Sequence, residues 1–309
     1  MTLPEIYADI RRRGGVADYS ARAKFHLTGT DRVRFLNGQV SNDVRRASDR
    51  ETLYACVMTP KGKMSGDIMI SAGADFLRLD AEPSLRESLA HRLERYIISD
   101  DAALQDVTEQ TCLIHLFGEG FGRASHAVEN HVSVLSSRRL GVAGFDLLMN
   151  REFFSETWRS FTQKLPVADE EMLEVLRVEA GIPRWGRELT AETIPVEAGL
   201  DKTAIDYEKG CYVGQEIISR LKSVGHVNKR LCGFVSESPL QPGMRLFAAD
   251  ESTREAGWLT SAVYSFGLEK YAALGYLKRG GEVLTARHPG AHGEEATLLV
   301  NVRGLPLIQ

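Results

Sequence analysis

The part of the chain after about residue 226 constrains the fold most, because it consists of short apolar segments at even spacing. Glycine or proline lies in most of the connections between these segments. Evenly spaced short strands are typical of a small β-barrel or sandwich. The segments cover residues 231–236, 244–249, 257–265, 271–277, 282–287 and 296–302. The sequence therefore predicts a C-terminal β domain over residues 226–309.

Residues 50–107 show a different pattern, in which strands and a helix alternate. An apolar strand over residues 53–58 is followed by a hairpin with arms at 67–71 and 75–80 around a glycine. Apolar residues then recur at helical spacing over residues 85–97. This order predicts a compact α+β unit.

The segment between these two regions ends in a long irregular stretch. Two helices are predicted over residues 152–165 and 169–180, with Pro166 between them and Gly181 ending the second. Residues 182–209 contain several prolines and glycines and show no clear periodicity. An irregular stretch of this length inside a compact domain is often a functional loop.

The composition is that of an ordinary globular protein. The chain has 309 residues, of which 43% are hydrophobic and 26% charged, so it can bury a substantial core in two or three domains. Its formal net charge of −4 does not favour a nucleic-acid-binding protein, which is usually basic overall. No apolar run reaches the roughly 18 residues of a membrane span, and the N-terminus lacks the apolar core of a secretory signal.

The cysteines indicate the compartment. They lie far apart, at positions 56, 112, 211 and 232, and form no CxxC pair. Neither a disulfide framework nor a zinc site is therefore indicated, and we expect no metal site. Unpaired cysteines fit a reducing environment, so the sequence predicts a cytoplasmic protein.

One cysteine lies in a segment that could carry chemistry. A thiol between glycines and just before a helix N-terminus, here a helix predicted over residues 215–221, can have a lowered pKa and act as a nucleophile or ligand. The alternative is a buried cysteine in a tight turn. The segment is Lys209, Gly210, Cys211, Tyr212, Val213, Gly214, Gln215 and Glu216.

This segment resembles the signature of the YgfZ-type folate-binding proteins, which are relatives of the glycine-cleavage T-protein, an aminomethyltransferase. Further motifs of that family have counterparts in the same order over roughly residues 25–235. Several ordered motifs are far more specific than one. The counterparts are Phe35–Val44, Thr59–Met64, Arg177–Pro183 and Asn228–Arg230.

The resemblance implies an α+β fold of the aminomethyltransferase type, with three domains in a ring. Two intertwined α+β units would surround a central pocket, and a β-barrel would follow at the C-terminus. The implied discontinuous domain, which holds the folate pocket and the cysteine motif, covers residues 1–49 and 108–225. The inserted domain covers residues 50–107, and the barrel covers residues 226–309.

The resemblance also implies a function. A YgfZ-type protein would bind tetrahydrofolate, or another reduced folate, and would support iron–sulfur cluster assembly or repair in client enzymes, and with it tRNA modification. The implied partners are folate and iron–sulfur assembly or client proteins, whereas neither a membrane nor a nucleic acid is expected as a partner. Cys211 would lie near the mouth of the pocket.

The family motifs place the candidate site residues. Catalytic roles would fall to Cys211 and Asp67, and Lys209 could support the thiolate. Each residue also has an ordinary structural explanation, since lysines in turns and arginines on helices are usually solvated and aromatic residues usually pack in a core. The candidate folate-binding residues are Asn42, Asp43, Lys61, Lys63, Asp67, Arg177, Glu179 and Tyr212, with Trp185 as a further stacking candidate.

The chain departs from the aminomethyltransferases in two motifs. Their pair of aspartates is matched here by Gly66-Asp67, so only one acidic residue is kept. Their glycine-rich hairpin carries a glutamate that grips the pterin, and the counterpart here, Gly141–Asp146, lacks it. Both departures favour the YgfZ branch. The alternatives are a folate-dependent aminomethyl- or methyltransferase and, more weakly, a folate-independent scaffold.

A basic stretch follows the cysteine motif. It contains Arg220, Lys222, Lys229 and Arg230 within eleven residues. Such a patch could bind a folate polyglutamate tail, an acidic protein or RNA. On an acidic protein it is more often a solvated surface.

Overall fold

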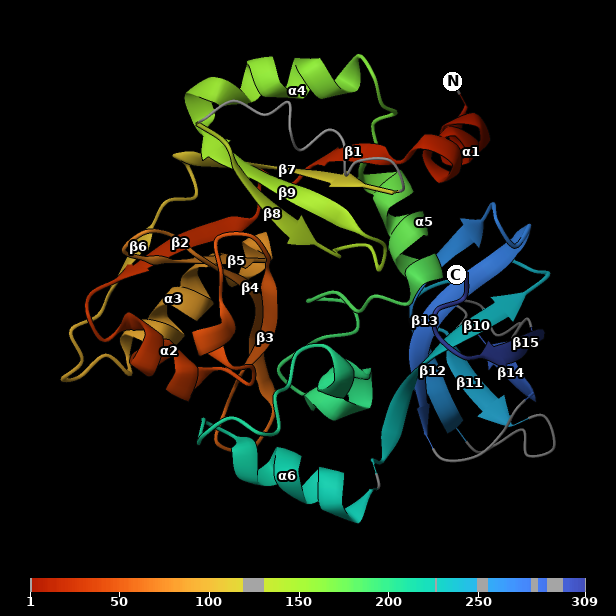
Figure 1. Cartoon of the computed structure of the whole chain (residues 1–309). Helices are drawn as coiled ribbons and strands as arrows, with labels where there is room; N and C mark the ends of the chain where they lie inside the picture. The colour runs from red at the N-terminus through yellow and green to blue at the C-terminus, as the bar shows by residue number, and fades with distance from the viewer. Residues whose placement is uncertain are drawn as a thin grey trace.

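Three β structures surround the centre of the molecule in the computed structural model (Figure 1). The structure describes residues 2–118, 131–225, 227–248, 255–278, 283–287 and 297–308. Two of the β structures are open antiparallel sheets, and the third is a closed barrel. This mixture of helices and strands with a closed C-terminal barrel confirms the fold class predicted from the sequence.

The first sheet has the strand order β1-β7-β9-β8. Helix α4 packs on it through Phe154 and Trp158, whereas α1 and α5 share a second core through Tyr7 and Met172. The helix predicted over residues 152–165 is shorter in the structure, where a 3₁₀ turn, η4, precedes α4. The elements are α1 (Leu3–Arg13), β1 (Gly15–Asp18), β7 (Thr111–Phe117), β8 (Ser133–Ser137), β9 (Gly144–Asn150), η4 (Arg151–Phe153), α4 (Phe154–Thr162) and α5 (Glu170–Ala180).

The second sheet has the strand order β3-β4-β5-β2-β6 and is covered by α2 and α3. Its core contains Phe35 and Leu89 from the two helices and Ile68 from β4. Strands β4 and β5 form the antiparallel hairpin that the sequence predicts. The elements are β2 (Ala23–Thr28), α2 (Arg32–Gln39), η1 (Val44–Arg46), β3 (Leu53–Met58), β4 (Met64–Ala72), β5 (Leu77–Ala81), η2 (Pro83–Leu85), α3 (Arg86–Glu94) and β6 (Ala103–Asp106).

The barrel closes in the order β10-β13-β12-β11-β14-β15. Its interior is filled by alternating apolar residues such as Phe234, Leu259 and Val300. A six-strand segment pattern in the sequence thus gives a closed barrel, which leaves no unpaired sheet edge. The strands are β10 (Lys229–Ser236), β11 (Arg245–Ala248), β12 (Glu255–Ser265), β13 (Lys270–Lys278), β14 (Val283–Arg287) and β15 (Thr297–Arg303).

Helix α5 connects the first sheet to the barrel (Figure 1). Asp169 caps its N-terminus by accepting a hydrogen bond of 2.9 Å from the Met172 N–H. Gly181, with φ of 71°, ends the helix in the left-handed conformation that glycine adopts most easily. Both ends agree with the helix predicted over residues 169–180.

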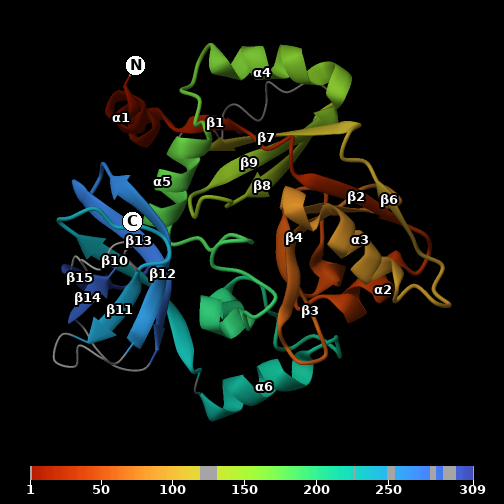
Figure 2. The ribbon, with the colours of Figure 1, turned by 180° about the vertical axis from the view of Figure 1, so that it is seen from behind.

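The chain from Ile182 to Lys209 crosses between the barrel and the second sheet, and α6 (Gln215–Val224) follows it at the bottom of the view (Figure 2). This stretch is irregular, as predicted, apart from two 3₁₀ turns, η5 (Pro195–Ala198) and η6 (Leu200–Lys202). In the described ranges, every helix is too short or too polar to cross a bilayer.

The two open sheets exchange strands along the chain. Strand β1 lies in the first sheet, β2 to β6 lie in the second, and β7 returns to the first. The sequence-based division assigns residues 23–28 to the discontinuous domain, whereas in the structure these residues form β2 and pair with β5 and β6. Their apolar face joins the core of the second sheet, which no local pattern indicates. The domain boundaries themselves stay a prediction.

Candidate functional site

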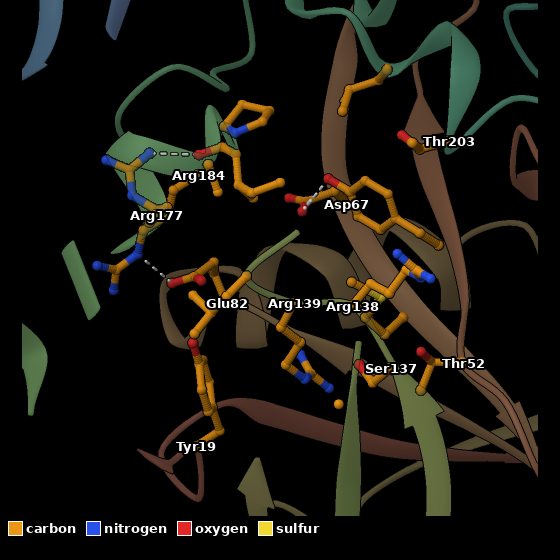
Figure 3. A pocket seen from close by; sticks show the side chains of 18 of the residues that line it. Tyr19, Thr52, Asp67, Glu82, Ser137, Arg138, Arg139, Arg177, Arg184 and Thr203 are labelled. Carbon is orange, nitrogen blue, oxygen red and sulfur yellow. Dashed lines mark hydrogen bonds and ion pairs between the residues drawn. The ribbon is translucent and has the colours of Figure 1, made fainter. Parts of the chain in front are cut away.

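A central cavity of about 1930 Å³ lies between the first sheet, the second sheet, α5 and the irregular segment. Its wall contains many charged side chains (Figure 3). Those drawn and labelled there are Asp67, Glu82, Arg138, Arg139, Arg177 and Arg184. The cavity is the candidate site, because large concave pockets with a few converging polar groups are where ligands usually bind.

Asp67 is the predicted site residue that the structure places most clearly in this cavity. It is buried on β4, where it lies opposite Cys56 of β3. The Tyr54 hydroxyl donates a 2.9 Å hydrogen bond to Asp67 Oδ2, but the buried Oδ1 has no partner among the described residues. Burial raises the pKa of Asp67 to about 6, although the positive charge of Arg22 and the bond from Tyr54 oppose the rise.

A chain of buried ion pairs lies beneath the cavity and joins the two open sheets. Arg22 Nε donates to Asp80 at 2.5 Å, and Arg139 pairs with the same Asp80. Arg139 also pairs with Asp146 of β9 at 2.8 Å. Burial would raise the pKa of Asp146, but Arg139 and His115 hold it well below the usual range. These arginines are therefore committed to carboxylates of the protein itself.

Asn42 also lines the cavity, whereas its neighbour Asp43 does not. The Asn42 side chain donates to the Tyr54 carbonyl oxygen at 2.9 Å. Asp43 caps η1 and forms an ion pair of 2.7 Å with Arg45, which explains its acidic side chain without a ligand. Of this predicted pair, only Asn42 can contact a molecule in the cavity.

The lysines of the turn after β3 lie outside the cavity lining. Lys61 is exposed, and Lys63 forms an ion pair with Glu192. The glycine between them has a structural reason: Gly62 has φ of 72°, and an added Cβ would lie 2.7 Å from Ile217 on α6. The turn therefore packs against the helix that follows the cysteine motif.

Arg177 lines the cavity but has no free donor. All five N–H groups of its guanidinium are matched by acceptors, so a folate carboxylate would have to displace one of them. The acceptors are Glu174, Glu188, Ser261 and the Ile182 carbonyl oxygen.

Glu179 lies apart from the cavity lining. It is fully buried and accepts hydrogen bonds from Tyr7, Arg11 and Ser265 at 2.8, 2.5 and 2.6 Å. The structure thus uses Glu179 to join α1, α5 and the barrel.

In the cysteine motif, Cys211 is exposed and does not belong to the cavity lining, although Tyr207 and Glu208 do. Lys209 is buried, and its Nζ donates to the carbonyl oxygens of Asn37, Val40 and Asn42 at 2.6, 2.7 and 2.8 Å. Burial lowers the pKa of Lys209 to about 8, and nearby Asp43 and Asp206 oppose this change. Lys209 therefore ties the motif to the end of α2 and is neither solvated nor directed to the thiol.

Most of the remaining motif residues serve the packing of the fold and do not line the cavity. Tyr212 is buried in a core with Met58 and Ile218, outside the cavity lining, whereas Trp185 does line the cavity. Gly214 has φ of 88°, and an added Cβ would lie 2.7 Å from the Thr59 carbonyl oxygen. Gln215 and Glu216 begin α6, where Glu216 pairs with Arg220. Gly210 has open space around it, and nothing in the structure explains it.

The basic stretch is largely paired. Lys229 lies 3.6 Å from Glu197, and Lys222 lies 3.9 Å from the centre of the Tyr207 ring. Of the four basic residues, Lys222 lines the cavity. The patch is therefore mostly a solvated and paired surface.

Several cavity residues were missed by sequence reasoning, because no motif contains them. The signal that could have found two of them is closeness in sequence: only Leu140 separates Arg138 and Arg139 from the Gly141–Asp146 stretch, of which Gly144 lines the cavity. The missed residues are Tyr19, Arg22, Tyr54, Glu82, Arg138, Arg139 and Arg184.

Comparisons with known proteins agree with this arrangement. Residues 5–120 match the GCVT N-terminal domain family. The structure resembles a glycine cleavage system aminomethyltransferase T from Bartonella henselae, with a TM-score of 0.86 and 16% identity over 99% of this chain and 89% of that one. The tRNA-modifying protein YgfZ of Escherichia fergusonii is 28% identical over 77% of each chain.

These matches support the placement of the chain among the YgfZ-type members of the aminomethyltransferase-like superfamily. This confirms the family that the motifs indicate. A chloroplastic protein of Arabidopsis thaliana with a transferase name is 26% identical over 85% of this chain, and the match spans 65% of the Arabidopsis protein. In this chain, the cysteine motif that resembles the YgfZ signature lies outside the cavity lining, whereas Asp67 lies within it.

Proposed function

We propose that this YgfZ-type protein binds a reduced folate, such as tetrahydrofolate, in the central cavity. The observation that carries the proposal is the buried Oδ1 of Asp67, which faces the cavity without a hydrogen-bond partner among the described residues. A buried acceptor of this kind is costly unless a ligand donates to it. The amino group and ring N–H groups of a pterin are such donors, and they form their strongest bonds to a carboxylate.

Other features of the wall fit the same ligand. Tyr54, which contacts Asp67, and Trp185 add aromatic surface to the cavity wall, and Asn42 adds a polar amide. The cavity volume of about 1930 Å³ exceeds that of ordinary small-molecule pockets, so a molecule of folate size can enter. In the bound complex, Asp67 would orient the pterin, while folate itself would supply one-carbon chemistry.

Anaerobic calorimetric titration with tetrahydrofolate tests this proposal. We expect saturable binding to the wild type and at least about tenfold weaker binding to Asp67→Asn, because the charged acceptor is lost. Lys61→Ala is the matched comparison, since Lys61 is exposed and outside the cavity lining. Absence of wild-type binding at millimolar folate would contradict the proposal and favour the folate-independent scaffold.

We further propose that the folate-bound protein supports iron–sulfur cluster assembly or repair in client enzymes of the cytoplasm. The support is the family placement together with the cysteines, all of which are free thiols, and Cys211 is the exposed one. Within the described residues, no group of three His, Cys, Asp or Glu side chains is placed to hold a metal ion. Any cluster contact by Cys211 would therefore need ligands from a client or assembly protein.

Client activities in a deletion strain test this second step. Wild-type protein should restore the activity of cluster-dependent enzymes, and Cys211→Ala should not. Cys232→Ala is the matched control, because that thiol is buried in the barrel core. Full restoration by Cys211→Ala would remove the role given to this thiol.

A folate-dependent transferase is the alternative that one observation favours. The raised pKa of Asp67, about 6, lets its carboxyl hold or release a proton near neutral pH, as one-carbon transfer requires. Formation of a folate one-carbon adduct from an aminomethylated lipoyl protein or a methylated amine would support it. If the protein binds folate but forms no such adduct, the result would favour the role in iron–sulfur cluster assembly or repair.

A further inference from the structure

We propose that Arg138, together with the buried hydroxyl of Ser137, forms the carboxylate-binding end of the cavity, where the glutamyl carboxylates of folate bind. This inference rests on the proposed folate-binding function. It assigns the anionic part of the ligand to residues outside every sequence motif. Arg138 would thus take the place of Arg177 as the arginine that binds the folate carboxylate, because the donors of Arg177 are all engaged within the protein.

Arg138 differs from the other arginines that line the cavity. Its side chain is exposed and, within the described part of the chain, forms no ion pair or hydrogen bond. A guanidinium with free donors is well suited to bind a carboxylate in a bidentate geometry. The others are paired: Arg22 with Asp80 and Glu82, Arg46 with Asp206, Arg139 with Asp80 and Asp146, Arg177 with Glu174 and Glu188, and Arg184 with Glu82.

Ser137 provides an independent observation at the same place. It is the last residue of β8, it lines the cavity, and its side chain is only 5% exposed. Its Oγ has no hydrogen-bond partner among the described residues. A buried hydroxyl without a partner costs free energy that a carboxylate acceptor beside it would recover.

The wall between Asp67 and Arg138 is continuous. Thr52 donates through its N–H and its hydroxyl to the Ser136 carbonyl oxygen, at 3.0 and 3.2 Å, which places β8 against the start of β3. Two residues further along, on the same face, Tyr54 donates to Asp67.

This wall has opposite chemistry at its two ends. Asp67 presents an acceptor at one end, and Arg138 with Ser137 presents donors at the other. A folate has ring N–H donors at one end and carboxylates at the other, so the wall fixes its direction. Glu51, which lines the cavity and bridges to Ser136, is the acidic residue beside the donor end. It opposes the binding of an anion.

Anaerobic calorimetry with two ligands tests the inference, because tetrahydropteroate lacks the glutamyl group of tetrahydrofolate. We expect the wild type to bind tetrahydrofolate about tenfold more tightly than tetrahydropteroate. Arg138→Met should lose this preference by weakening only tetrahydrofolate, whereas Glu51→Gln should strengthen tetrahydrofolate. Arg95→Met is the matched control, since Arg95 is an exposed arginine after α3 that does not line the cavity.

The outcomes separate this inference from the folate proposal. An unchanged preference in Arg138→Met, or no preference in the wild type, would overturn the inference while leaving folate binding intact. If neither ligand binds the wild type, both proposals fail. A circular dichroism spectrum of Arg138→Met equal to that of the wild type would show that the effect is not caused by misfolding.

Discussion

Tyr54 donates a hydrogen bond to one oxygen of Asp67 and leaves the other oxygen of that carboxylate buried without a partner among the described residues. The two residues lie on adjacent antiparallel strands, β3 and β4. The tyrosine holds the carboxylate in one orientation, and the free oxygen faces the cavity. The cavity thus contains an acidic group that is already oriented in the absence of a ligand.

The first prediction concerns the pH dependence of folate affinity. Because the pKa of Asp67 is about 6, its ionised form, which accepts the stronger hydrogen bond, is lost as the pH falls through that value. We expect the affinity for tetrahydrofolate to fall about tenfold between about pH 7 and about pH 5. Calorimetric titrations across this range check it. An equal fall in Asp67→Asn would assign the effect to the ligand instead.

The second prediction concerns stability. The folded protein keeps the Asp67 proton up to about pH 6, whereas the unfolded chain releases it near its usual value of about 4. The folded state therefore binds the extra proton between these values, and this stabilisation is lost as the pH rises. We expect the free energy of unfolding of the wild type to fall, relative to that of Asp67→Asn, by about 1 kcal/mol per pH unit as the pH rises through that window. Urea unfolding at several pH values measures the difference, and parallel curves would contradict it.

The third prediction separates structure from ligand binding at Arg177. Arg177→Met would leave the buried Glu188 without its cation, so we expect a loss of about 3 kcal/mol in unfolding free energy. Tetrahydrofolate affinity of the folded fraction should change less than about twofold. Denaturant unfolding and calorimetry measure the two quantities. A variant that is as stable as the wild type but binds folate weakly would contradict this prediction and indicate that Arg177 contacts the ligand.

The fourth prediction compares two glycines of one motif. Gly214→Ala would place a Cβ against the Thr59 carbonyl oxygen at a positive φ, so we expect a loss of about 2 kcal/mol or more. Gly210 has no such contact, and Gly210→Ala should stay within about 0.5 kcal/mol of the wild type. Thermal and urea unfolding distinguish them. A destabilised Gly210→Ala would reveal a constraint on the backbone that the contacts do not explain.

The sequence predicted those parts of the molecule that local patterns determine. The hairpin of β4 and β5, the capped α5 and the barrel strands follow from alternation, capping residues and glycine spacing. Asp67 was found because a family motif contains it.

Other site residues depend on distant partners that no local pattern shows. Arg177 is engaged by Glu188 and Ser261, and Lys209 by carbonyl groups near Val40. That Arg138 has no ion-pair partner among the described residues follows only from the tertiary structure, which pairs the other arginines of the cavity. Long-range pairing therefore decides which charges are free for a ligand, and a single sequence does not carry that information.

The anchoring of the cysteine motif has a consequence for how the thiol can act. Before Cys211 in the sequence, Lys209 binds carbonyl oxygens at the end of α2. After it, Gly214 packs against the Thr59 carbonyl oxygen. The exposed thiol is thus held in place at the surface, so it can react only with molecules that bind there. Any exchange between a ligand bound in the central cavity and Cys211 would therefore require a mobile ligand or a second protein, because Cys211 does not line the cavity.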